Sequence, residues 1–237
     1  MNCIVVINIE GFLTENARSS IRSACSRWRA DYVEVTHHPM PYLHPCFLKA
    51  KALLRLCEYE RIAYFDADML VRSDAPNCFE LCPDANKLYM VRDIAEARPW
   101  TPESLKRNIV DWVRVPYFEP VASELGGAVE FQRYIDHFAN AGFLICSPSR
   151  HQTLFRFIES HFPASGDRFA GNGHYEQALF NYAVQLLADA HLEFLDQTWN
   201  FIEPDLCVER MNSYVYHFAG LNDRPLKRAI RNFPWTL

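Results

Sequence analysis

Short apolar segments alternate along the chain with longer segments that repeat an apolar residue every three or four positions. The short segments at 4–7, 32–36, 62–65, 88–91, 143–146 and 192–195 predict strands, because four or five residues are too few for a helix. Strands that alternate with helices are typical of a parallel sheet covered by helices. The pattern therefore predicts an α/β fold with a mostly parallel central sheet. The sequence shows no internal repeat and no linker that would divide the chain into two domains.

The longer segments carry helix signals. Thr14 can cap a helix with a single apolar stripe, formed by Ala17, Ile21, Ala24 and Trp28. A second helix would carry on one face Phe47, Ala50, Leu54 and Cys57. Lys49 and Lys51 fall nearer the opposite face of that helix, so we expect them to be solvated, although one of them could reach a phosphate.

The middle of the chain has weaker signals. Thr101, with proline at the next position, predicts a helix start, and Ser149 predicts the cap of another helix. Residues 112–138 lie between them, and their irregular pattern includes Pro116, Pro120 and two adjacent glycines. Insertions of this kind tend to shape pockets, so we expect 112–138 to contact an acceptor substrate.

Two aspartates directly follow the predicted strand at 62–65. Asp66 and Asp68 flank Ala67, so extended backbone would point both carboxylates to the same side. The ligand crevice of an open α/β sheet lies beyond the carboxyl ends of its strands. Two ionised carboxylates this close repel each other unless a cation lies between them, which predicts a divalent metal site. The alternative is that Asp66 only caps a turn and Asp68 is solvated.

Polar residues and glycines also follow other predicted strands. Asn8 and Gly11 lie in the loop after the first strand, a place suited to the edge of a nucleotide site. Asp93 follows the strand at 88–91, and His217 and Gly220 end a short late strand. These residues add candidates for the ligand crevice.

A glycine-rich loop at 166–173 precedes a helix with a polar first turn. Glu176 and Gln177 stand in that turn. Glu176 either complements the helix dipole or faces the crevice together with Gln177, and the sequence leaves both possibilities open.

Composition narrows the classes of function. The 237 residues are 49% hydrophobic and carry a net charge of −5, which predicts a folded core and argues against a general nucleic-acid binder. The N-terminus has neither the basic region nor the apolar run of a secretory signal, so we expect the eight cysteines to stay reduced. No run approaches the roughly 18 apolar residues of a membrane-spanning helix. We expect a cytoplasmic protein, at most peripheral to a membrane.

In this order, the elements resemble the GT-A glycosyltransferases, especially the family 8-like group typified by glycogenin and the bacterial lipopolysaccharide galactosyltransferases. The segment from Phe47 to Val71 looks like that group's Asp-x-Asp region with its preceding helix, and Asn140-Ala141-Gly142 precedes a strand as in that group. Weaker similarities are Tyr175 to Asn181, Trp199-Asn200, and His217 to Gly220. The resemblance covers most of the chain.

The resemblance implies one GT-A catalytic domain over residues 1–237. About 1–92 would be a Rossmann-like half that binds a nucleotide sugar, about 93–220 would bind the donor sugar and the acceptor, and 221–237 would be a basic tail. The implied activity is transfer of a hexose from a UDP-sugar to a hydroxyl of a glycan, lipid-linked or protein acceptor, with retention at the anomeric carbon.

The resemblance also implies a metal site. Asp66, Asp68 and His217 would hold Mn²⁺ or Mg²⁺ on the donor diphosphate. Two carboxylates, one imidazole and two diphosphate oxygens nearly fill an octahedron, and the imidazole favours Mn²⁺. The metal would neutralise the charge that develops on the departing UDP.

Substrate roles follow from the same resemblance. Glu176 and Gln177 would position the sugar and stabilise its oxocarbenium character, and Glu176 becomes a candidate base if transfer is inverting. Asp93 and Asn140 would contact sugar hydroxyls. The other substrate-binding candidates are Asn8, Gly11, Lys49 or Lys51, Ala141, Gly142, Gly220 and Arg224. The chain departs from the family at Glu176, where aspartate is usual, and at Asp223, where lysine is common.

Three other functions fit part of the pattern. A haloacid-dehalogenase-like phosphatase also has Asp-x-Asp after a buried strand, but usually near the N-terminus and followed by threonine or valine, whereas Met69 and Leu70 follow here. A nucleotidyltransferase can share the same fold. A catalytically silent module that binds sugar nucleotides or glycans is the alternative from another class, because a fold does not prove activity.

Overall fold

The computed structural model describes residues 1–9, 11–93, 113–187, 191–202 and 213–219. Its centre is a six-stranded sheet in the order β2-β1-β3-β6-β5-β7. The strands are β1 (Asn2–Ile7), β2 (Asp31–Val35), β3 (Arg61–Phe65), β5 (Lys87–Arg92), β6 (Ala139–Cys146) and β7 (His191–Leu195). Strand β6 is antiparallel to β3 and β5, and the other pairs are parallel. The mostly parallel sheet of the predicted α/β fold is confirmed.

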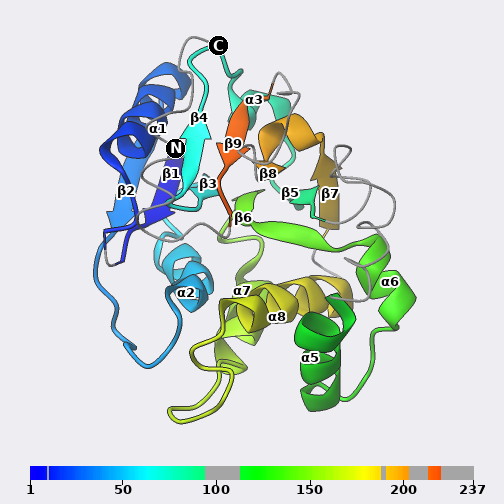
Figure 1. Ribbon diagram of the computed structural model, residues 1–237. Coiled ribbons are helices and arrows are strands. Elements are labelled where there is room, and N and C mark those ends of the chain that lie inside the picture. The colour runs from blue at the N-terminus through cyan, green and yellow to red at the C-terminus, as the bar shows by residue number, and fades with distance from the viewer. Residues whose placement is uncertain (10, 94–112, 188–190, 203–212, 220–237) are drawn as a thin grey trace.

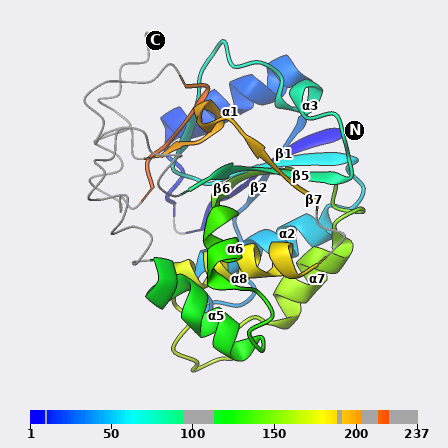
Figure 2. The same cartoon turned by 90° about the vertical axis from the view of Figure 1, so that its right-hand side faces the viewer.

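Helices cover both faces of the sheet (Figures 1 and 2). One face packs against α2 (Leu48–Arg55), α5 (Glu119–Glu124), α6 (Phe131–Asp136), α7 (Gln152–Ser160) and α8 (Gly173–Leu186). The other face packs against α1 (Glu15–Trp28) and α3 (Cys78–Leu81). Successive residues of β1 and β3 belong alternately to the two cores, as the alternation of side chains along a strand requires.

A second, three-stranded sheet lies on the α1 side and was only partly predicted. Its order is β4 (Met69–Val71), β9 (Val215–His217) and β8 (Phe201–Ile202). The short late strand corresponds to β9, whereas β4 and β8 were not predicted. Met69 pairs with His217 across β4 and β9, and this pairing brings the two distant segments together.

Several local predictions are corrected by the structure. Residues 114–118 form the π-helical segment η3 (Arg114–Phe118), followed by α5 and α6, so most of the segment expected to be irregular is helical. Ser149 does not cap α7, whose N-cap is His151. The predicted helix at Thr101 lies outside the described residues. Among the described residues, no helix combines the length and the apolar character needed to cross a bilayer.

The first helix forms as its sequence predicts. Thr14 is its N-cap, and the Thr14 hydroxyl accepts a hydrogen bond from the Ala17 backbone N–H at 3.2 Å. The apolar stripe is buried against the sheet and consists of Ala17, Ile21, Ala24 and Trp28. The cap satisfies one of the N–H groups that a helix N-terminus leaves without a partner.

We expect Thr14→Ala to lower the free energy of unfolding by about 1 kcal/mol, because it removes this cap. Thr14→Ser retains the hydroxyl and should lose much less. Urea denaturation of both variants measures the difference, and an equal loss in the two variants would contradict a capping role.

Candidate active site

Three potential metal ligands converge where β3 ends. Asp66 follows β3, Asp68 precedes β4, and His217 is the last residue of β9. His217 Nε2 lies 3.2 Å from Asp68 Oδ1 and 3.8 Å from Asp66 Oδ2. One potential ligand atom of each residue lies within 4.8 Å of those of the other two, and this spacing can hold one metal ion. The structure thus brings together the three residues that the sequence suggested as ligands.

Gly142 lets the backbone of β6 approach this group closely. The Asp66 backbone N–H donates to the Gly142 carbonyl at 2.8 Å. A Cβ at position 142 would lie 2.5 Å from His217 Cε1 and 2.6 Å from Asp66 Oδ2. Because real Cβ atoms essentially never come so close, a larger residue would displace the histidine or the aspartate.

The two carboxylates of this group favour a cation beside them. Asp68 Oδ1 is buried, and His217 Nε2 lies 3.2 Å from it. Burial acts to lower the pKa of His217, but the charge of Asp68, its polar contact with the imidazole and the charge of Asp66 outweigh burial, and the pKa is raised. The site therefore favours positive charge beside the two carboxylates, and either a proton on Nε2 or a metal ion can supply it.

A chain of hydrogen bonds leads from the histidine to Gln177. His217 Nδ1 and Asn200 Oδ1 are 3.0 Å apart, and Asn200 Nδ2 donates to Asn140 Oδ1 at 3.0 Å. Asn140 Nδ2 donates to Asp93 Oδ2 at 3.4 Å, and Gln177 Nε2 donates to the same oxygen at 2.8 Å. The predicted sugar-contacting residues thus lie in one network with the predicted metal ligand.

Glu176 lies in a separate buried pair with Lys49. Lys49 Nζ is 3.4 Å from Glu176 Oε2, and the two residues are only 1% and 3% exposed. Burial raises the pKa of Glu176 to about 7, and Lys49 lowers it in part. Burial acts to lower the pKa of Lys49, but Glu176 and Asp66 outweigh it and raise that pKa. The expectation that Lys49 is solvated is therefore wrong.

Tyr64 connects this pair to the aspartates. Its ring centre lies 5.0 Å from Lys49 Nζ, and its hydroxyl donates to Asp66 Oδ1 at 2.5 Å. The sequence predicts Tyr64 only as part of a buried strand, because an aromatic residue in such a strand carries no sign of a polar role. Lys51 instead lies 3.7 Å from Glu159 and is partly exposed, so only Lys49 joins the Glu176 cluster.

The other predicted substrate-binding residues lie in different parts of the fold, and two of them lie outside the described residues. Asn8 accepts from the Leu13 backbone N–H at 3.0 Å and donates to Glu34 at 2.7 Å, so its side chain holds the loop after β1. Gly11 in this loop has a φ of 75°, which favours glycine. Ala141 is buried in β6. Gly220 and Arg224 lie outside the described residues.

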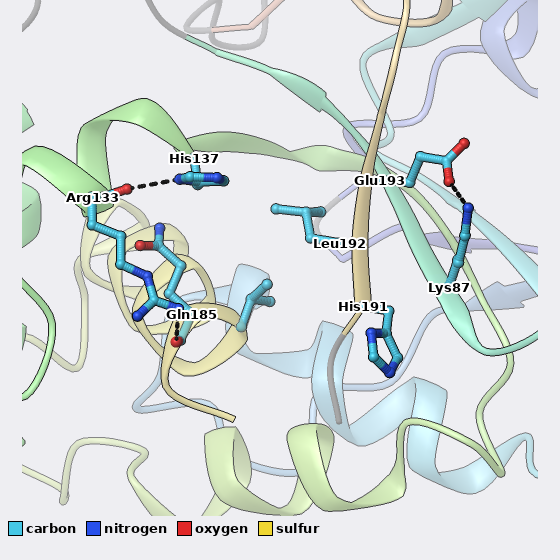
Figure 3. Close-up of a pocket in the computed structure, with 8 residues that line it drawn as sticks. Lys87, Arg133, His137, Gln185, His191, Leu192 and Glu193 are labelled. Atoms are coloured by element: carbon cyan, nitrogen blue, oxygen red, sulfur yellow. Dashed lines mark hydrogen bonds and ion pairs between the residues drawn. The ribbon is translucent and has the colours of Figure 1, made fainter. Parts of the chain in front are cut away.

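A pocket of about 410 Å³ lies apart from Asp66, Asp68 and His217 (Figure 3). Its lining includes Lys87 and His191, which begin β5 and β7. Asp93 follows the last residue of β5, so this pocket lies toward the opposite end of the strands from the acidic group. Its lysine pairs with Glu193, and its Arg133 donates to the Gln185 carbonyl at 3.0 Å.

Comparison with solved structures identifies the fold. A glycosyltransferase involved in glycosylation of the major capsid of PBCV-1 matches with a TM-score of 0.57 and 12% identity, over 97% of this chain and 98% of that chain. The bifunctional glycosyltransferase WbbM matches with a TM-score of 0.59 and 12% identity, over 98% of this chain and 50% of that chain. GlyE from Streptococcus pneumoniae TIGR4 matches with a TM-score of 0.50 and 13% identity, over 99% of this chain and 61% of that chain.

These similarities confirm the predicted GT-A glycosyltransferase fold. At 12% to 13% identity, they describe the fold and not the substrates. No family model matches the sequence, and no curated protein matches it.

The buried pair makes a pH-dependent prediction. Glu176 has a pKa of about 7 in the folded chain against an ordinary 4.5, so the folded state binds more protons between these values. Stability should therefore fall as pH rises through this window, and Glu176→Gln should remove that part of the slope. Denaturation at several pH values measures it, and an unchanged slope would contradict the assignment.

Lys49→Met should lower the free energy of unfolding by about 3–5 kcal/mol above neutral pH, because it leaves the Glu176 carboxylate buried and unpaired. The loss should shrink toward about pH 5, where Glu176 can take up a proton. Lys51→Met is the matched control, and its partly exposed ion pair should contribute about 1 kcal/mol or less. Equal losses in the two variants would contradict a buried ion pair.

Proposed function

We propose that this chain is a metal-dependent glycosyltransferase that moves a hexose from a UDP-sugar to a hydroxyl of a glycan, lipid-linked or protein acceptor, with retention. The observation that carries the proposal is the Asp66, Asp68 and His217 group, which lies at the carboxyl end of β3 in a glycosyltransferase fold. That position is the usual ligand crevice of an α/β sheet. The sugar-transfer activities named for the similar structures support it.

The metal would be held by Asp66, Asp68 and His217. When bound, Mn²⁺ or Mg²⁺ would neutralise charge on the diphosphate leaving group. A mixed set of two carboxylates and one imidazole suits Mn²⁺ better than Mg²⁺, which prefers oxygen ligands alone. Tyr64 would keep Asp66 in place through its hydrogen bond to Oδ1.

The donor sugar would lie between the metal ligands and the start of α8. Asp93 and Gln177 are already held together by a 2.8 Å hydrogen bond, so they are preorganised to orient sugar hydroxyls. Glu176 is buried one residue earlier and is electrostatically coupled to Asp66. Its carboxylate would stabilise positive charge that develops on the anomeric carbon.

Retention can proceed without a dedicated base. The bond from the anomeric carbon to the diphosphate oxygen breaks, and the acceptor oxygen bonds to that carbon on the same face. The acceptor proton passes to the leaving diphosphate oxygen, so atoms and charge balance. Lys49 would moderate the charge of Glu176 during this step, since the two side chains are 3.4 Å apart.

Nucleotide binding can be tested by thermal shift. UDP at about 100 times its Kd should stabilise the protein by about 2.7 kcal/mol in the presence of Mn²⁺, and GDP and ADP should do so less. A chelator or Asp68→Asn should abolish the shift. Asp136→Asn removes an exposed carboxylate of α6 and should leave the shift intact. If no nucleotide stabilises the folded protein, the metal-diphosphate site is wrong.

The rate of transfer should depend on the ionisation of Glu176. If the carboxylate is the active form, kcat rises with pH around the Glu176 pKa of about 7 and then levels. Glu176→Gln should be about 10²- to 10⁴-fold slower and lack this rise. Release of UDP from UDP-glucose and UDP-galactose measures both profiles, with Glu159→Gln as the control. A rise that persists in Glu176→Gln would assign the titration to another group.

A further inference from the structure

The hydrogen bonds around Asn140 have a fixed direction. The Gly142 backbone N–H can only donate, and it lies 2.9 Å from Asn140 Oδ1. The Asn140 atom at that position must therefore be the carboxamide oxygen. Its other carboxamide atom, the nitrogen, faces Asp93 Oδ2 at 3.4 Å, where a carboxylate can accept. Both neighbours of Asn140 thus require the same orientation of its amide.

The orientation of the Asn140 amide also fixes the orientation of the Asn200 amide. The Asn200 atom that lies 3.0 Å from Asn140 Oδ1 must be a donor, so it is Nδ2. The remaining polar atom of the Asn200 side chain is Oδ1, which can only accept, and it lies 3.0 Å from His217 Nδ1. His217 Nδ1 must then carry a proton. One backbone N–H therefore determines the tautomer of a histidine two side chains away.

We propose that Asn200 is a positioning residue that keeps a proton on His217 Nδ1 and leaves Nε2 as the atom that faces Asp66 and Asp68. Asn140, Asn200 and His217 are 5%, 1% and 3% exposed, so bulk water does not compete for these bonds. Nε2, at 3.2 Å from Asp68 Oδ1, is then the only ring nitrogen that can bind a cation beside the carboxylates. The metal-binding part rests on the proposed function.

The expected size of the effect follows from metal chemistry. Histidines that bind metals usually donate their other N–H to a neighbouring acceptor, and loss of that acceptor typically weakens metal affinity about 10- to 100-fold. Without Asn200, the imidazole could place its proton on Nε2, and the metal would have to displace it. Asn200 is not one of the predicted metal ligands, so it would act on the metal through its Oδ1 contact with His217 Nδ1.

The tautomer can be read directly by NMR of ¹⁵N-labelled histidine in the wild-type protein. Nδ1 of His217 should stay protonated in the metal-free protein at every pH at which it is folded, and also in the protein saturated with diamagnetic Mg²⁺. A His217 signal that lacks the Nδ1 proton in either state overturns the proposal. This measurement needs no variant, and in the metal-free protein it does not depend on the proposed function.

Two variants separate positioning from a merely structural role. Asn200→Ala removes the acceptor and should weaken Mn²⁺ binding about 10- to 100-fold. Asn200→Asp loses the donor to Asn140 Oδ1 but retains an acceptor for Nδ1–H and adds negative charge beside the imidazole, so it should bind Mn²⁺ at least as tightly as wild type. Electron paramagnetic resonance of free Mn²⁺ measures both. Asn77→Asp is the matched control, because this residue caps the distant α3 and aspartate caps as well.

The outcomes are distinct. Weaker binding in Asn200→Ala with full binding in Asn200→Asp supports the proposal, whereas equal affinity in Asn200→Ala and wild type overturns it. Equal weakening in both Asn200 variants also overturns it, because metal binding would then depend on packing or on the Asn200 bond to Asn140 and not on the acceptor for Nδ1–H. If wild type itself binds no Mn²⁺ or Mg²⁺, the proposed function fails, and NMR of the metal-free protein still decides the tautomer.

Discussion

The site depends on the mutual repulsion of two carboxylates that the fold holds close together. Asp66 and Asp68 flank a single residue at the end of a buried strand, and His217 reaches them from a strand about 150 residues later. Gly142 lets a third strand approach within contact distance, since any Cβ there would strike both His217 and Asp66. Four strands, β3, β4, β6 and β9, thus converge on one point that favours positive charge.

Around this point, polar side chains are buried as partners of one another. Lys49 neutralises Glu176, and the two asparagines join His217 to Asp93. A buried ion pair contributes little net stability, because desolvation offsets most of the Coulomb attraction. The pair between α2 and α8 is therefore not explained by its net contribution to stability. Its position beside the aspartates fits the control of charge that we propose for sugar transfer.

Much of the fold was predictable because it rests on local patterns. The strands of the central sheet were located to within a few residues at their ends, and the Thr14 cap and apolar stripe of α1 were correct. Residues 114–136 were not recognised as largely helical, since prolines and short turns interrupt their periodicity. Lys49 was misplaced, because helical periodicity assigns a lysine to solvent unless its partner is known. That partner, Glu176, lies on another helix.

The sequence by itself determined the α/β class, the acidic pair after a buried strand and the polar first turn of α8. These follow from side-chain alternation and helix signals, which act between near neighbours. The family resemblance implied that His217 joins the aspartates, but only the tertiary structure decided how closely they meet, that Lys49 rather than Lys51 pairs with Glu176, and that Asn200 contacts the histidine. Each of these contacts joins residues far apart in the chain, and such pairings depend on packing and strand register that no local pattern specifies.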